Sequence, residues 1–96
     1  MQAYVFTDKA ERDLEKIVDF TVKHWSKSQA VKYIDGLEEL AQTLADNPGI
    51  GVLRDGLSTG LFSFPYQSHI LYYIKNSRGI VIVRVLHASM DSANNL

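Results

Sequence analysis

The sequence predicts an α+β domain in which a short strand precedes an antiparallel helical hairpin and a three-stranded antiparallel sheet follows, in the order β-α-α-β-β-β. Three observations predict this fold. Apolar residues recur at helical spacing between residues 8 and 46, and they follow a strand pattern from residue 61 onward. Glycines gather between these two regions, at residues 49–60. The 96 residues are enough for a single domain, 1–96, with one core.

The helical hairpin is predicted from its caps and its apolar faces. Residues 3–6 form a short strand, and Thr7 is a suitable N-cap for a helix that begins at Asp8. Ser26 and Gln29 have the spacing of a capping box, so a second helix begins there and ends before Asn47-Pro48. The apolar face of the first helix comprises Ala10, Leu14, Ile17, Val18, Thr21 and Trp25, and that of the second comprises Ala30, Tyr33, Ile34, Leu37, Leu40, Ala41 and Leu44. Gly36 inside the second helix predicts a close helix–helix crossing.

Three strands are expected after an irregular, glycine-rich connection. They span residues 61–64, 69–75 and 80–87, and residues 76–79 have the composition of a hairpin turn. Strict alternation in the last strand places Val81, Val83 and Val85 on one face, and Ile80, Ile82, Arg84 and Leu86 on the other. Both faces are apolar apart from Arg84. This pattern predicts a central strand with helices on one side and a partner near the other.

Composition and charge restrict the classes of function. The absence of cysteine excludes disulfides, thiolate zinc sites and a cysteine nucleophile, and it fits a reducing compartment. Residues 1–49 carry nine acidic and six basic side chains, a balance of −3, whereas residues 50–96 carry a balance of +2. Proteins that hold a phosphate backbone usually show a denser basic patch, so direct sequence-specific nucleic-acid binding is not expected.

The targeting signals point to a cytoplasmic protein without membrane association. The first residues lack a basic segment followed by a long apolar run, so we expect no secretory signal. No stretch approaches the roughly 20 apolar residues that a membrane-spanning helix needs.

The chemically capable side chains predict neither a metal site nor a cofactor. His24, His69 and His87 are not at metal-ligand spacing. The glycine pairs lead into a strand, whereas a phosphate cradle needs a helix N-terminus directly after the loop. We therefore expect no cofactor, no metal and no catalytic residues.

Arg84 is open to two interpretations. An arginine among apolar strand residues must reach water, a carboxylate or a partner. It could be ion-paired with Asp91 or with an acid on a helix. Alternatively, it marks a working surface together with His87 and residues 88–96. Among the aromatic residues of the strands, most are expected in the core, and Tyr66 is one of those expected to be exposed.

Taken in order, these residues resemble the ParE-type toxins of bacterial type II toxin–antitoxin pairs, within the RelE/ParE superfamily. The resemblance rests on Ala10 to Ile17 and Trp25, on Ala30, Tyr33, Ile34 and Leu37, on Asn47-Pro48 and Gly51, on Gly60-Leu61, Phe64-Pro65 and Tyr72-Tyr73, and on Arg84 to His87 with Met90-Asp91. These matches cover nearly the whole chain. Each is weak alone, and their order and spacing make the set specific.

This resemblance implies a toxin that inhibits DNA gyrase by protein–protein binding and is neutralised by a ParD-like antitoxin. The candidate target-binding residues are Arg84, His87, Met90, Asp91 and Tyr66. The candidate antitoxin-binding residues are Trp25, Tyr33, Ile80, Ile82 and Leu86. The alternative is a RelE-like, ribosome-dependent mRNA endoribonuclease, which would need several Arg and Lys side chains and an acid or base to activate a 2′-hydroxyl. The second half of the chain offers few such residues, which favours the gyrase-directed toxin.

Overall fold

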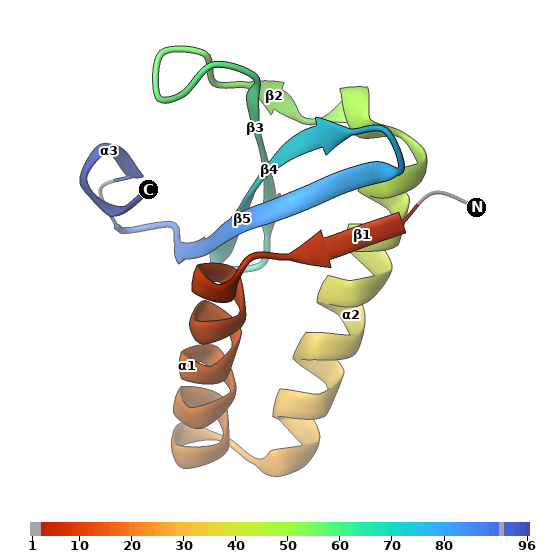
Figure 1. The fold of residues 1–96 in the computed structure, drawn as a ribbon. Helices are drawn as coiled ribbons and strands as arrows, with labels where there is room; N and C mark the ends of the chain where they lie inside the picture. Colours follow the sequence, from red (N-terminus) through yellow and green to blue (C-terminus); the bar gives the residue numbers. More distant parts are fainter. Residues whose placement is uncertain (1–2, 91) are drawn as a thin grey trace.

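The computed structural model describes residues 3–90 and 92–96, and its element order confirms the predicted α+β fold (Figure 1). The elements are β1 (Ala3–Phe6), α1 (Asp8–His24), α2 (Lys27–Asp46), the 3-10 helix η1 (Pro48–Ile50), β2 (Val52–Leu53), β3 (Leu61–Tyr66), β4 (His69–Asn76), β5 (Gly79–His87) and α3 (Ser92–Asn95). Helices α1 and α2 form the predicted hairpin below the sheet in Figure 1. None of the described helices is long and apolar enough to cross a membrane.

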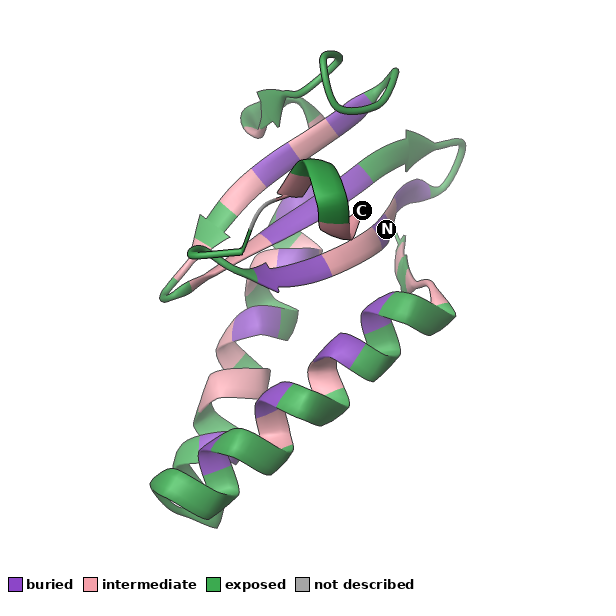
Figure 2. Cartoon of the chain, turned by 90° about the vertical axis from the view of Figure 1, so that its left-hand side faces the viewer, coloured by how far each residue is buried: buried purple, intermediate pink, exposed green. Residues whose placement is uncertain are grey.

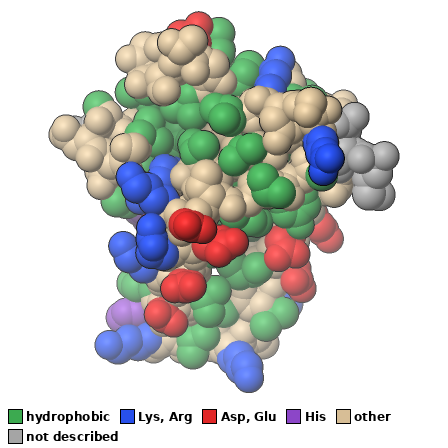
Figure 3. All heavy atoms as spheres, in the orientation of Figure 1, with side chains coloured by type: hydrophobic (Ala, Val, Ile, Leu, Met, Phe, Trp, Pro, Cys, Tyr) green, Lys and Arg blue, Asp and Glu red, His purple; other side chains and the backbone are tan. Residues whose placement is uncertain are grey.

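Both helix starts follow the predicted caps. The Thr7 hydroxyl accepts a hydrogen bond from the backbone N–H of Ala10 at 3.1 Å, and the Ser26 hydroxyl accepts one from Gln29 at 3.0 Å. Each cap satisfies a backbone donor that the first turn of a helix leaves free. Acidic side chains form a band across the helical layer in Figure 3, in agreement with the negative balance of the first half of the chain.

The sheet has five strands in the order β1-β5-β4-β3-β2, two more than the three that follow the helices in the prediction. Strand β1 pairs with β5 in parallel, while all other neighbouring strands of the sheet are antiparallel. Residues 3–6 were expected as a strand, but their partner is more than seventy residues away, and local sequence carries no signal for such a pairing. Strand β2 has two residues, too few to show an alternation.

A register shift in β5 changes the faces that its side chains occupy. Tyr72 pairs with Arg84 but Tyr73 pairs with Ile82, so Val83 is an extra residue on β5. Ile82 and Val85 therefore both face the helices, and the strict alternation predicted for residues 80–87 is wrong beyond Ile82.

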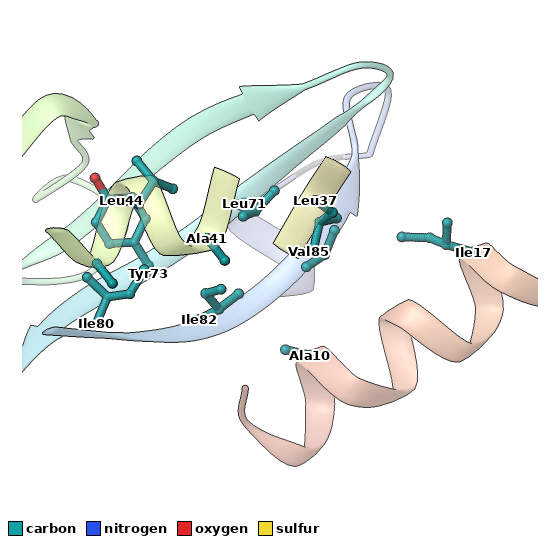
Figure 4. Close-up of a cluster of buried hydrophobic side chains, with 11 residues drawn as sticks. Ala10, Ile17, Leu37, Ala41, Leu44, Leu71, Tyr73, Ile80, Ile82 and Val85 are labelled. Carbon is teal, nitrogen blue, oxygen red and sulfur yellow. The ribbon is translucent and has the colours of Figure 1, made fainter. Parts of the chain in front are cut away.

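The main core lies between the sheet and the hairpin (Figure 4). It contains Ala10, Ile17, Leu37, Ala41, Leu44, Ala45, Leu71, Tyr73, Ile80, Ile82 and Val85. Ile80 and Ile82 are 0% exposed. Their expected place on an antitoxin-facing surface is therefore wrong in this structure, because the hairpin helices already cover that face of β5.

Gly36 in α2 makes room for a tyrosine of the sheet. A Cβ atom at this position would overlap the Tyr66 hydroxyl, which donates a hydrogen bond to the Tyr33 carbonyl at 2.7 Å. The close helix–helix crossing predicted from Gly36 is therefore wrong. The close approach is between α2 and a side chain of β3, and it holds Tyr66 half-buried against the helix.

The opposite face of the sheet carries a smaller apolar cluster. Leu61, Tyr72 and Leu86 are buried there, and Ile70, Val83 and Leu96 pack against them. In Figure 2 the α3 ribbon crosses in front of the sheet, and the packing of Leu96 places the end of the chain on this cluster. The chain's own C-terminal segment thus occupies part of the face where a partner was expected.

Candidate functional site

A groove of about 610 Å³ runs beside α1, toward the ends of β4 and β5. It brings together six of the ten candidate residues, namely Trp25, Tyr33, Arg84, Leu86, His87 and Met90. Sequence reasoning divided these six between a target and an antitoxin, but they line one surface. Tyr66 lies outside the groove lining, packed against Gly36. Asp91 lies outside the described residues.

Large apolar side chains are exposed along the groove. Trp25 is 75% exposed, Phe20 59% and Met90 42%. Phe20 lies against the His24 ring, with ring centroids 4.3 Å apart. Phe20 was not among the candidate residues, because it falls off the predicted apolar face of α1. A phenylalanine among the charged residues of that helix was the signal that could have identified it. Exposed aromatic residues gathered on a concave surface are typical of protein-binding sites.

Arg84 is held by an acid of α1, and both residues line the groove. Its Nε and Nη2 atoms donate to the two carboxylate oxygens of Asp13 at 2.8 and 2.9 Å, and Nη1 donates to the Asn95 carbonyl. The hydrogen bonds to Asp13 raise the pKa of Arg84 above its ordinary value; burial opposes this shift, and the Asp13 charge adds to it. Of the two ion partners considered from sequence, the structure shows the helix acid.

Asp13 also completes the backbone pairing of β5. Strand β1 pairs with β5 only as far as Ile82, so the backbone N–H and C=O groups of β5 beyond Ile82 on that side need other hydrogen-bond partners. Thr7 donates its backbone N–H to the Ile82 carbonyl and its hydroxyl to the Val83 carbonyl. Asp13 accepts the Val85 N–H at 3.0 Å. The side of α1 thus closes the sheet edge and fixes the position of Arg84 in the groove.

Two histidines meet in the groove as a cross-strand pair. His69 of β4 lies directly opposite His87 of β5, with ring centroids 5.3 Å apart. The His69 Nδ1 atom is 2.6 Å from the Tyr33 hydroxyl. The spacing of these histidines in the sequence gave no sign of the pair, because their proximity depends on the register between β4 and β5.

The Nδ1 atom of His87 is engaged by the residues that follow β5. It accepts the backbone N–H of Ser89 at 3.1 Å and lies 2.7 Å from the Ser89 hydroxyl oxygen. Among residues 3–90 and 92–96, no three His, Asp or Glu side chains are grouped closely enough to hold a metal ion.

Because of the histidine pair, we expect the free energy of unfolding to be lower in mild acid than at neutral pH. Burial, together with the nearby His87, lowers the pKa of His69, and the Asp13 charge partly offsets this. The folded state then binds fewer protons than the unfolded state once the pH falls below the unfolded value of about 6.5, so the free energy of unfolding decreases from there to the folded pKa. Urea unfolding at pH 7.5 and 5.5 should show a larger decrease for wild type than for His69→Gln.

His24 provides the matched control for this experiment, because it is exposed at the end of α1. The variant His24→Gln should retain the wild-type pH dependence. Equal pH dependence in the wild type and in His69→Gln would contradict the electrostatic account of the pair.

The family model for the ParE toxin of type II toxin–antitoxin systems, parDE, matches residues 4–92 of this chain. The chain belongs to the ParE toxin family. The match includes α1, α2 and all the sheet strands except the first residue of β1, so the groove lies almost wholly within the matched region.

Curated ParE toxins resemble this ParE-family chain over its full length. Toxin ParE1 of Mycobacterium tuberculosis is 35% identical over 94 residues, which cover 97% of this chain and 96% of the relative. Toxin ParE1 of Caulobacter vibrioides is 30% identical over 96 residues, covering 100% and 99%. Toxin ParE of Escherichia coli is 29% identical over 97 residues, covering 100% and 94%.

Solved structures share the ParE fold described above. A structure of the chromosomal ParDE toxin–antitoxin system from P. aeruginosa matches with a TM-score of 0.74 at 21% identity, covering 91% of this chain and 96% of that chain. The RelBE2 toxin–antitoxin complex from Mycobacterium tuberculosis matches with a TM-score of 0.58 at 28% identity, covering 91% and 99%.

Proposed function

We propose that this ParE-type toxin inhibits DNA gyrase by protein–protein contact and that a ParD-like antitoxin neutralises it by occupying the same groove. The observation that carries the proposal is the groove in which the exposed aromatic residues Phe20 and Trp25, in α1 and at its C-cap, lie beside Arg84, His87 and Met90. Family membership supports the toxin role, and the ParDE system from P. aeruginosa provides a structural relative that has an antitoxin.

The chemistry of the groove suits a protein partner better than a reacting substrate. Trp25, Phe20 and Met90 can bury large areas against another protein, as residues that dominate interface energies do. Arg84, a cation of the groove lining, already directs three of its five N–H donors at Asp13 and Asn95. Binding without chemistry would inhibit gyrase by favouring one state of its cycle.

Sharing one groove means that the two partners compete. Trp25 follows α1 and Met90 follows β5, so the two partners can rely on residues from different elements of the groove lining. An antitoxin that fills the groove would exclude gyrase sterically. Neutralisation then requires no change in the shape of the toxin.

The test is supercoiling of relaxed plasmid by purified gyrase with ATP. We expect wild-type toxin to inhibit supercoiling and to trap cleaved DNA, and we expect added antitoxin to reverse both effects. Met90→Ala should weaken the inhibition, whereas Trp25→Ala should weaken antitoxin binding about thirtyfold, the effect of losing a side chain worth about 2 kcal/mol at an interface. Val31→Ala, which alters an exposed apolar residue of α2 outside the groove lining, is the matched control.

Lack of inhibition at high toxin excess would contradict gyrase as the target. Inhibition that Trp25→Ala and Met90→Ala leave unchanged, with antitoxin binding also unchanged, would contradict the groove as the shared site while leaving the target in place.

The second candidate function is ribosome-dependent mRNA cleavage. The paired imidazoles of His69 and His87, with Lys16 and Arg84 in the same groove, are the observation that favours it. An imidazole could take the proton of a 2′-hydroxyl, and the cations could bind the phosphate. On translating ribosomes this hypothesis requires cleavage by wild type and its loss in His87→Ala. Intact mRNA with the wild-type toxin would rule it out.

A further inference from the structure

Arg84 lies between two hollows of the molecule. It lines the groove described above, and it also lines a second hollow of about 560 Å³ near the start of α1, the loop before β3 and Leu96. Two of its nitrogen atoms bind Asp13 toward α1, and the third binds the Asn95 carbonyl of α3. One guanidinium thus connects the groove, the sheet edge and the C-terminal segment, and the link does not depend on the identity of the toxin's target.

Residues 92–96, termed the C-terminal strap, depend on tertiary contacts for their position. Helix α3 spans four residues, and its end is marked by the hydrogen bond from the Leu96 N–H to the Ser92 carbonyl at 3.2 Å. A helix of this length is not stable by itself, because the conformational entropy lost in nucleation exceeds the stabilisation from the hydrogen bonds of one turn. The contacts that hold it include the bond from Arg84 to Asn95 and the packing of Leu96 on the sheet.

The C-terminal strap covers an apolar surface. Leu61, Tyr72 and Leu86 are almost fully buried on the sheet face away from the hairpin, and Leu96 is among the side chains packed against them. This face belongs to the sheet and needs no rearrangement to form. Displacement of the strap would therefore remove Leu96 from this cluster and expose part of its apolar surface.

We propose that Arg84 couples the groove to the C-terminal strap, so that a partner carboxylate entering the groove draws Arg84 away from Asn95 and uncovers the apolar sheet face. A guanidinium is planar and its donors have fixed directions. Three of its five N–H donors are directed at Asp13 and Asn95, so turning the guanidinium to give a groove carboxylate a paired interaction breaks at least one of these bonds. The groove also contains Lys16, which favours an acidic side chain of the partner.

The proposal is tested by hydrogen exchange and NMR of residues 92–96, together with binding of an apolar dye to the full chain. Arg84→Lys retains the positive charge but loses the planar guanidinium, whose N–H donors have fixed directions. We expect it to increase exchange in the strap at least tenfold and to increase dye binding, with α2 unchanged. Arg78→Lys, on the exposed turn between β4 and β5, is the matched control and should resemble wild type.

Asp13→Asn distinguishes coupling from simple loss of a contact. Asp13 accepts bonds from Arg84 and from the Val85 N–H; asparagine can still accept the Val85 N–H, but it holds Arg84 weakly. We expect faster exchange in the strap for this variant as well. A strap that exchanges as in wild type in both Asp13→Asn and Arg84→Lys would overturn the proposal.

Leu96→Asn keeps the test decisive if a charge variant fails to fold. It removes the apolar end of the strap without altering Arg84, so it should increase dye binding to the uncovered face. Unchanged dye binding in Leu96→Asn would show that the strap does not cover an accessible patch, which would also overturn the proposal.

Discussion

Replacing Asp13 by alanine is expected to lower the free energy of unfolding by about 3 kcal/mol. The Asp13 side chain is 8% exposed, and its oxygens accept two bonds from Arg84 and one from the Val85 N–H. Alanine leaves the arginine unpaired and a buried backbone donor unsatisfied, and each of these is costly. The Arg84 side chain is 16% exposed and can recover some hydration, so we expect the lower end of the range for broken buried pairs.

Urea unfolding followed by circular dichroism measures this change, and Asp19→Ala provides the control. Asp19 is an exposed acid of the same helix, so its removal should change the free energy by no more than about 0.5 kcal/mol. If Asp13→Ala is as stable as Asp19→Ala, the hydrogen bonds from Asp13 of α1 to Arg84 and Val85 of β5 do not stabilise the sheet edge. The paired variant Asp13→Asn with Arg84→Met should lose less than Asp13→Ala, because it leaves no unpaired charge and retains an acceptor for Val85.

The elements that sequence predicts well are those whose signals are local. Thr7 and Ser26 mark the helix starts because a capping hydroxyl acts within three residues of its own position. The turn at residues 76–79 joins β4 to β5 for the same reason. In contrast, the parallel pairing of β1 with β5 and the extra residue at Val83 depend on contacts between distant parts of the chain.

The candidate site shows the same division between local and distant information. Arg84 was recognised as unusual for its position, with His87 beside it, and Trp25 and Met90 were candidates through the family resemblance. The structure places all four in one groove. The histidine pair was not predictable, because it follows from the β4–β5 register. Burial of Ile80 and Ile82 was also missed, because an apolar strand residue gives no indication of which face the helices cover.

Gly79→Ala is expected to lower the free energy of unfolding by about 3 kcal/mol, because both the backbone conformation and the space at this position exclude a side chain. Gly79 has φ of +144°, a conformation that residues with a Cβ atom rarely adopt. A Cβ atom here would overlap the Ala3 carbonyl oxygen and lie 2.9 Å from the Ala3 nitrogen. These are backbone atoms of β1, so the strand must move and lose its pairing with β5.

The loss of local stability in Gly79→Ala should be largest in β1, and it should extend to the groove. Strand β1 leads directly into Thr7 and α1, so its displacement also weakens the contact between Asp13 and Arg84. Thermal unfolding measures the overall effect, and hydrogen exchange at residues 3–6 locates it. Gly56→Ala is the control, because nothing lies within 4 Å of its Cβ position and alanine there should be neutral or slightly stabilising. Equal stability of the two variants would mean that the pairing of β1 does not depend on Gly79. The position of α1, and with it the groove, would then be fixed by the helical hairpin and by the hydrogen bonds of Asp13 to β5.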